Sequence, residues 1–176
     1  MIETHRFGLF VPTTTKYLIL GSFSGRQAVK GTAYTYEAYD WFYGTKTNQF
    51  WPIMERVYGI PLKSRENKQE LLESLDIGIA DIISSCERRQ GNNLDTNLFN
   101  IVYAVEPIQQ IFANNNIEKV FFTSRFVEKK FKKVFNSIVE ENPSTELITL
   151  PSPSPRYVRV SLEEKVRRYK EVLPGF

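Results

Sequence analysis

The residues of this chain that could do chemistry lie in short polar segments that each follow an apolar run. One is the turn 21–25, with the sequence Gly-Ser-Phe-Ser-Gly, and another is 151–155, with the sequence Pro-Ser-Pro-Ser-Pro, before Arg156 and Tyr157. Glycine lets a backbone N–H approach a phosphate or a base edge, whereas the prolines fix the backbone around two hydroxyls and could form a stiff wedge against a DNA duplex. Ordinary surface turns have the same composition, so neither segment alone indicates a function.

A second kind of chemistry is indicated by residues 41–51, in which five aromatic side chains surround Asn48. Aromatic rings stack on bases, and an amide can hold a water molecule or a base edge through hydrogen bonds. The simpler alternative is that Phe50 and Trp51 belong to the core of a helix and that Asn48 caps it. We expect this alternative to hold for Phe50 and Trp51, whereas Tyr43 stays a candidate for stacking on a base.

The remaining polar side chains of note receive simpler interpretations. Asp81 and Asp95 have no obvious partner in the sequence; Asp81 could cap a turn at the strand end, and Asp95 could cap a helix. His5 lies near the amino terminus, where we expect no active-site role. Cys86 is the only cysteine, which excludes an internal disulfide and leaves no cysteine cluster for zinc or an iron–sulfur centre. We therefore expect neither a metal nor a cofactor.

The elements that must position these residues are predicted from the apolar patterns. Buried strands are predicted at 17–20, 77–83, 120–123 and 147–150. Helices are predicted at 48–57, 68–75, 106–114, 124–140 and 161–172. Strands that alternate with helices predict an α/β fold with a parallel sheet, whose ligands bind beyond the carboxyl ends of the strands. Four loops follow these strands and should meet at one crevice: 21–25, 84–89, 124–125 and 151–157.

Length and composition narrow the class of protein further. With 176 residues the chain fits one domain over 1–176, and no stretch approaches the ~18 apolar residues of a membrane span. The amino terminus carries early charges and no apolar signal segment, so we expect a cytoplasmic protein, and a monomer. Residues 125–176 hold 11 basic and 7 acidic residues. This surplus suits a phosphate backbone, although an ordinary solvated helix explains the lysines of 129–133 better.

In their order along the chain, these segments resemble the uracil-DNA glycosylase superfamily, particularly its hypoxanthine-DNA glycosylase and mismatch-specific (thymine/uracil) branches. The turn 21–25 is similar to the first motif of the superfamily, and residues 48–51 (Asn-Gln-Phe-Trp) are similar to an Asn-x-Phe-Trp signature. Cys86-Glu87-Arg88, with Gly91 and Asp95 after it, resembles a loop of the hypoxanthine branch. Residues 150–155 and 160–163 resemble the second motif and the helix behind it.

The resemblance implies a single three-layer α/β domain with a four-stranded parallel sheet flanked by helices. It also implies an enzyme that flips a deaminated base, hypoxanthine or uracil, out of DNA and hydrolyses its glycosidic bond without a metal or cofactor. Asn48 is then the catalytic residue, because Phe23 stands where the mismatch-specific branch has an asparagine. Ser152 stands where family 1 enzymes have a histidine, so the chain is not of that family.

The remaining roles implied by the resemblance concern the base and the duplex. Tyr43 lies five residues before Asn48, where related enzymes have the aromatic residue that stacks on the base. Ser22, Phe23 and Ser152 are the other candidates for base binding. The candidates for contacts with DNA are Arg88, Arg125, Ser154, Pro155, Arg156 and Tyr157.

Two other functions stay open at this stage. Phe23 can neither orient a water molecule nor take up a proton, which leaves room for a non-catalytic module of the same fold that binds damaged DNA. An unrelated α/β enzyme that handles nucleotides is the third possibility, because a fold does not determine a function.

Overall fold

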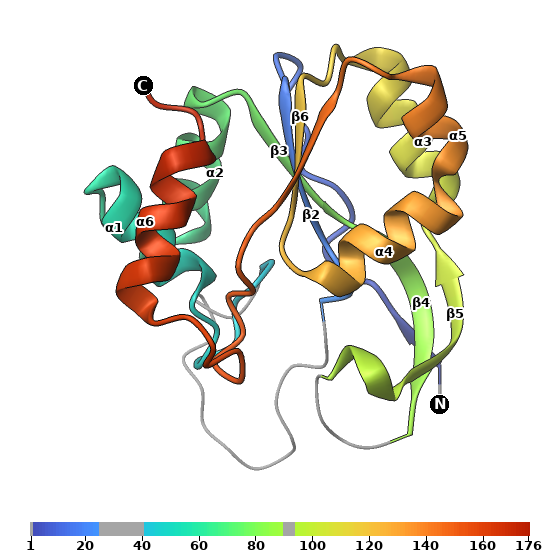
Figure 1. Cartoon of the computed structure of the whole chain (residues 1–176), viewed down its shortest axis with the longest axis horizontal. Coiled ribbons are helices and arrows are strands. Elements are labelled where there is room, and N and C mark those ends of the chain that lie inside the picture. Colours follow the sequence, from blue (N-terminus) through green and yellow to red (C-terminus); the bar gives the residue numbers. More distant parts are fainter. Residues whose placement is uncertain (1, 25–40, 90–93) are drawn as a thin grey trace. The chain divides into compact units, whose positions relative to one another are not determined.

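The structure, a computed structural model of the whole chain, describes residues 2–24, 41–89 and 94–176 (Figure 1). The chain forms two compact units, and each is built from two separate stretches of sequence. Unit 1 comprises Met1–Arg26 and Asp76–Thr149, and unit 2 comprises Gln27–Leu75 and Leu150–Phe176. A single domain over 1–176 stays a prediction.

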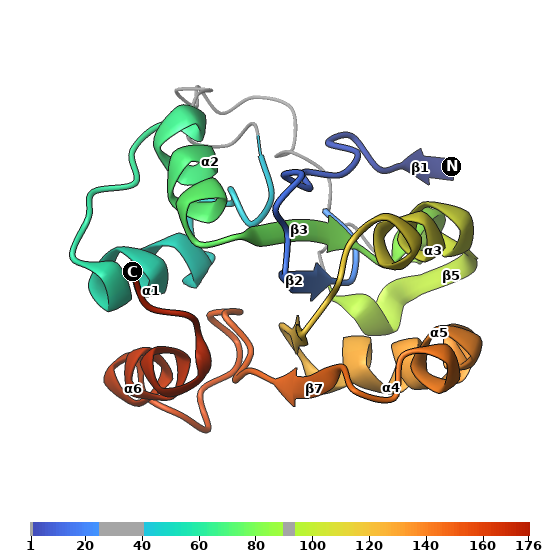
Figure 2. The same ribbon diagram turned by 90° about the horizontal axis from the view of Figure 1, so that it is seen from above.

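Unit 1 contains the predicted parallel sheet. Its strands are β2 (Tyr17–Gly21), β3 (Ile77–Asp81), β6 (Lys119–Phe122) and β7 (Glu146–Thr149), in the order β3-β2-β6-β7 (Figures 1 and 2). All three strand pairs are parallel. The α/β fold with a four-stranded parallel sheet is thus confirmed, and three of its four strands lie within one residue of their predicted bounds.

The central strand β2 shows why these residues form a parallel sheet. Leu18, Ile19 and Leu20 are fully buried, as expected for a strand covered on both faces. Each such side chain contributes about 1.5–3 kcal/mol when it leaves water. Leu18 and Leu20 belong to a core cluster that also contains side chains of three helices. These helices are α3 (Val105–Asn114), α4 (Arg125–Val134) and α5 (Asn136–Glu141).

The predicted strand 77–83 and the predicted loop 84–89 are both partly wrong. The long strand ends at Asp81, and a second strand, β4 (Ile83–Arg88), pairs antiparallel with β1 (Ile2–Thr4) and β5 (Leu98–Tyr103). In β4 only Ile83 and Cys86 are buried. An antiparallel strand can expose one face to water, so its serines and charges resembled a loop in the sequence. Neither β1 nor β5 was predicted, and a short 3-10 turn, Asp95–Asn97, precedes β5.

The predicted helix 124–140 is two helices. α4 ends at Val134, and Phe135 leaves the helical conformation before α5 begins. The start was predicted correctly, because the Ser124 side chain accepts a hydrogen bond from the N–H of Val127. Phe131 and Phe135 are fully buried, with their rings stacked at 5.1 Å. Residues four apart also meet in a continuous helix, so the apolar pattern runs across the break.

Unit 2 is helical. It contains α1 (Phe50–Tyr58), α2 (Arg65–Ser74) and α6 (Leu162–Val172), and α1 lies beside α6 in both views (Figures 1 and 2). Ser161 caps α6 by accepting the N–H of Glu164, as its sequence pattern predicts. Gly59 ends α1 with a φ of 68°, a left-handed conformation that glycine adopts without strain. Among the described residues, no helix is long and apolar enough to cross a bilayer.

Candidate active site

In unit 1, the turn that follows β2 presents an open row of backbone donors. The N–H groups of Ser22, Phe23 and Ser24 form no hydrogen bond with any residue in the described part of the chain. The carbonyl of Ser22, by contrast, accepts the N–H of Ile83 at 3.1 Å. All three residues are partly exposed. Consecutive free N–H groups attract anions and carbonyl oxygens, so the turn can hold an oxygen atom that gains negative charge.

The serine side chains of this turn are held by two carboxylates. The hydroxyl of Ser22 donates to Oδ1 of Asp95 at 2.7 Å, and that of Ser24 donates to Oδ2 of Asp81 at 2.7 Å. Nε2 of His5 lies 2.8 Å from the same Asp81 oxygen. Nδ1 of His5 accepts the N–H of Phe7 at 3.3 Å, so in a neutral ring the proton is on Nε2 and points at Asp81. Asp81 and Asp95 therefore both have partners, which the sequence did not reveal.

Phe23, between the two serines, is held by aromatic and charged neighbours. The His5 ring lies 5.9 Å from the Phe23 ring in an edge-to-face arrangement, and the Arg88 guanidinium lies 5.6 Å from its centre. Arg88 also donates from Nε to Oε2 of Glu3 at 2.9 Å, and the Arg88 side chain is only 5% exposed. The guanidinium of Arg88 is thus held between Glu3 and the Phe23 ring, and a contact of Arg88 with DNA stays a prediction.

Asp95 combines burial with partial access to solvent. Burial raises the pKa of its carboxyl, and the nearby charge of Asp81 raises it further; the Ser22 hydrogen bond and the Arg88 charge oppose this shift. Apart from the bond with Ser22, the Asp95 carboxylate has no partner among the described residues. Carboxyl groups of this kind are frequent in acid–base catalysis.

In unit 2, Asn48 lies directly before α1. Its Oδ1 accepts the N–H of Phe50 at 2.9 Å, which satisfies one free donor of the first helical turn. The capping alternative is therefore correct in substance, although the cap position itself is Gln49. The Asn48 amide nitrogen forms no hydrogen bond within the described residues. Phe50 and Trp51 are buried, as expected.

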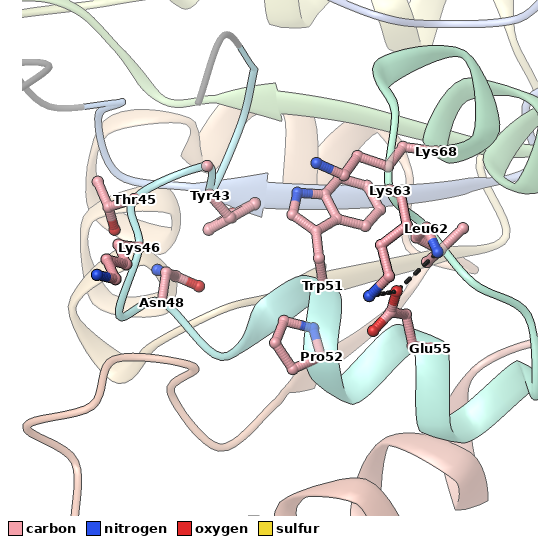
Figure 3. A pocket seen from close by; sticks show the side chains of 11 residues that line it. Tyr43, Thr45, Lys46, Asn48, Trp51, Pro52, Glu55, Leu62, Lys63 and Lys68 are labelled. Carbon is pink, nitrogen blue, oxygen red and sulfur yellow. Dashed lines mark hydrogen bonds and ion pairs between the residues drawn. The ribbon is translucent and has the colours of Figure 1, made fainter. Parts of the chain in front are cut away.

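Asn48 and Tyr43 line the same pocket, which has a volume of about 280 Å³. Figure 3 shows the two on one side of Trp51, and the ion pair of Glu55 with Lys63 on the other side. Tyr43 stacks on the ring of Phe50 at 4.3 Å, so one of its faces is covered. Its φ of 55° is unusual for an aromatic residue. Backbone strain of this kind is frequent at functional sites.

The proline-serine loop after β7 is held through its main-chain carbonyls. The Tyr169 hydroxyl donates to the carbonyl of Pro151 at 3.0 Å, and the backbone N–H of Gln49 donates to that of Pro153 at 2.9 Å. The ammonium of Lys165 donates to the Gln49 side chain at 2.7 Å and to the carbonyl of Ser154 at 3.3 Å. Gln49 is the neighbour of Asn48, so the structure brings the Asn48 segment and this loop together.

Lys165 is the unexpected member of this arrangement. It is 1% exposed, and desolvation lowers its pKa. A signal was present in the sequence, because Lys165 lies three residues after Leu162 and four before Tyr169, on the apolar face of the predicted helix. His5 had no comparable signal, since its partner lies 76 positions away.

Residues beyond the loop are open to solvent. Pro155 and Arg156 are exposed, Tyr157 is partly exposed, and Val158 is 82% exposed. Ser152 and Ser154 accept backbone N–H groups two residues ahead, which leaves their hydroxyl protons available. In unit 1, Arg125 is exposed at the first position of α4.

The predicted site residues thus form two groups. Ser22, Phe23 and Arg88 lie together in unit 1, and Arg125 belongs to the same unit. Unit 2 contains Tyr43, Asn48, Ser152, Ser154, Pro155, Arg156 and Tyr157. Within the described residues, no cluster of histidine, cysteine, aspartate and glutamate side chains could hold a metal ion. The roles of all these residues stay predictions.

Comparison with known proteins supports the fold. Neither a protein family nor a curated protein matches the sequence. Among solved structures, the chain is similar to the solution NMR structure of a "putative Uracil DNA glycosylase" from Methanosarcina acetivorans. The TM-score is 0.68 at 20% sequence identity, over 97% of this chain and 98% of the other. The two proteins therefore share one fold along nearly their whole length.

Proposed function

We propose that this protein is a DNA glycosylase that hydrolyses the N-glycosidic bond of a deaminated base, hypoxanthine or uracil. The observation that carries the proposal is the row of open N–H groups at Ser22, Phe23 and Ser24, at the carboxyl end of a parallel strand, where α/β folds bind ligands. The similarity in fold to a protein described as a glycosylase supports it. We further propose that it acts as a cytoplasmic monomer, without a metal or cofactor.

The proposed chemistry follows from the charges that develop when the bond breaks. The sugar gains positive charge and the departing base gains negative charge. The open N–H groups of 22–24 stabilise a carbonyl oxygen of the base as its charge grows. In unit 2, Asn48 orients the attacking water through its amide nitrogen, and Tyr43 stacks on the flipped base.

The surface of unit 2 suits contact with the DNA duplex. We propose that Pro155, Arg156 and Tyr157 press against the duplex while Ser152 and Ser154 offer hydroxyl donors. Lys165, Gln49 and Tyr169 hold this loop stiff, so little conformational entropy is lost on binding. Arg125 is the phosphate contact proposed in unit 1. Arg88 is left out of this surface because its guanidinium is buried beside Glu3.

The test is a panel of duplex and single-stranded oligonucleotides, each with one uracil, hypoxanthine, xanthine or thymine mismatch. Base release is measured as alkali-sensitive strand cleavage in the presence of EDTA. Wild-type protein should cleave the uracil or hypoxanthine substrate, and Asn48→Ala should lower the rate by about 10²-fold. Asn67→Ala, which removes an exposed amide from α2 in the same unit, is the matched control and should leave the rate unchanged.

One observation favours a second function, a non-catalytic module that binds damaged DNA. Oδ1 of Asn48 is already bonded to Phe50, and Phe23 offers no polar atom. This function predicts tight binding to abasic or lesion DNA and no base release from any substrate of the panel. Wild-type activity in Asn48→Ala, by contrast, would remove Asn48 from the mechanism while leaving the enzyme assignment intact.

A further inference from the structure

We propose that Asp95 is the general base of the reaction, the group that takes up the proton of the attacking water. This inference rests on the proposed glycosylase function and adds a residue to it. Hydrolysis must place a proton on some acceptor, yet a neutral amide such as that of Asn48 can orient water without accepting its proton. Phe23, at the position where the mismatch-specific branch has an asparagine, cannot accept one either.

The position of Asp95 beside the first-motif turn carries the proposal. Its Oδ1 accepts the Ser22 hydroxyl at 2.7 Å, so the carboxylate lies against the same turn that presents the open N–H groups. Its Oδ2 accepts no hydrogen bond from any residue in 2–24, 41–89 or 94–176, and Asp95 as a residue is partly exposed. One oxygen fixes the carboxylate, and the other is left for a water molecule.

The other carboxylates near this turn are already engaged. Asp81 is 3% exposed at its side chain, and its Oδ2 is bonded to both His5 and Ser24. Glu3 is 9% exposed and is paired with Arg88. Glu3 Oε1 is also buried, whereas Asp95 is fixed by the Ser22 hydroxyl and is a partly exposed residue.

The charges around Asp95 come from two strands. Asp81 at the end of β3 repels its negative charge, and Arg88 at the end of β4 attracts it. Together with burial, the repulsion makes the carboxylate a better proton acceptor than an exposed aspartate. The Ser22 hydroxyl works in the other direction, since it donates to the ionised form.

The proposed step balances without any further reactant. The water oxygen bonds to C1′ of the deoxyribose, the C1′–N bond breaks, and its electron pair stays on the base. The water proton passes to Asp95, which then gives it to the departed base anion. The products are a neutral base and an abasic sugar hydroxyl, and Asp95 is again ionised.

The experiment measures single-turnover base release between pH 5 and pH 9 on the best substrate of the lesion panel. The wild-type rate should rise with pH as Asp95 ionises and then level off. Asp95→Asn keeps the shape of the side chain and an oxygen to accept the Ser22 hydroxyl. This variant should be slower by about 10²–10³-fold and should lose the rise with pH. Asp76→Asn, at the amino end of β3, is the matched control and should keep both the rate and the profile.

A second variant tests the same assignment without removing the carboxylate. Ser22→Ala deletes the hydroxyl that lowers the pKa of Asp95, so the midpoint of the pH rise should move to higher pH. Two results would overturn the proposal: an Asp95→Asn variant with the wild-type pH rise, whatever its rate, or an unmoved midpoint in Ser22→Ala. Wild-type protein that releases no base from any substrate would instead overturn the proposed function, and the inference with it.

Discussion

Two regions, one in each unit, carry candidate site residues, and they are held in opposite ways. In the turn 22–24 of unit 1, the serine hydroxyls donate to the carboxylates of Asp95 and Asp81, and the backbone N–H groups form no hydrogen bond with the described residues. In the loop 151–157 of unit 2, donors from Gln49, Lys165 and Tyr169 bind backbone carbonyls, so the serine hydroxyls stay open. One region offers fixed N–H dipoles and the other offers hydroxyl groups that can rotate. Fixed N–H dipoles suit a single oxygen atom that gains negative charge during the reaction. Rotating hydroxyl groups suit a DNA surface whose shape varies with sequence.

The largest expected effect comes from breaking the unit 1 arrangement at Asp81. Asp81→Ala removes the oxygen that accepts from both the His5 ring and the Ser24 hydroxyl, on a side chain that is 3% exposed. An unsatisfied buried donor costs roughly 1–3 kcal/mol, so the free energy of unfolding should fall by about 3 kcal/mol. Urea denaturation at pH 7 measures it.

Asp81→Asn is the control for this prediction, because both bonds end on the same oxygen, Oδ2. A single amide oxygen can accept both donors, so this variant should lose less than about 1 kcal/mol. Equal stability of the alanine and asparagine variants would show that the shared acceptor does not stabilise the turn.

The sheet and its helices could be predicted because each depends on a local pattern. Continuous apolar runs such as 17–20 indicate buried parallel strands, and serine caps such as Ser161 mark helix starts. β4 could not be predicted, since a half-exposed antiparallel strand with serines and charges has the composition of a loop. The break at Phe135 could not be predicted either, because Phe131, Phe135 and Ile138 keep a helical spacing across it.

The candidate site was predictable only in part, for the same physical reason. Tyr43 and Asn48 could be found because they lie close together in an aromatic segment. The groups that hold the turn 22–24 could not, because the partners of Ser22 and His5 lie 73 and 76 positions away in the sequence. Such pairs form only when strands from distant parts of the chain align.

The unit 2 arrangement should respond less to the loss of its central donor. Lys165→Met removes the bonds to Gln49 and Ser154 but also removes a buried charge whose desolvation is unfavourable. These terms oppose each other, so the free energy of unfolding at pH 7 should change by about 1 kcal/mol or less. Base release should fall more clearly, because the loop 151–157 loses its stiffness.

The pH dependence of stability checks this explanation. Because the pKa of Lys165 is lower in the folded than in the unfolded chain, the unfolded chain binds more protons as pH rises toward 10. The wild type should therefore gain stability relative to Lys165→Met over that range. If the difference in free energy of unfolding between the two proteins stays constant with pH, desolvation of the Lys165 ammonium does not destabilise the folded protein. Tyr169→Phe, which removes only the hydroxyl bonded to Pro151, is the control, and the wild type should show no such gain relative to it over the same pH range.

The smallest expected effect on stability comes from Asp95→Asn, which should raise the free energy of unfolding and not lower it. Burial raises the pKa of this carboxyl, so the ionised form destabilises the folded chain at any pH above that value. Asp95→Asn keeps the Ser22 bond and removes the charge, and should raise the free energy of unfolding by up to about 1 kcal/mol at pH 7–8. The gain should disappear as pH falls through the pKa of the folded protein toward 4, where the wild-type carboxyl is protonated. If Asp95 served only to stabilise the fold, Asp95→Asn would lower the free energy of unfolding at neutral pH. A variant that is more stable but slower would show instead that the carboxylate acts in catalysis.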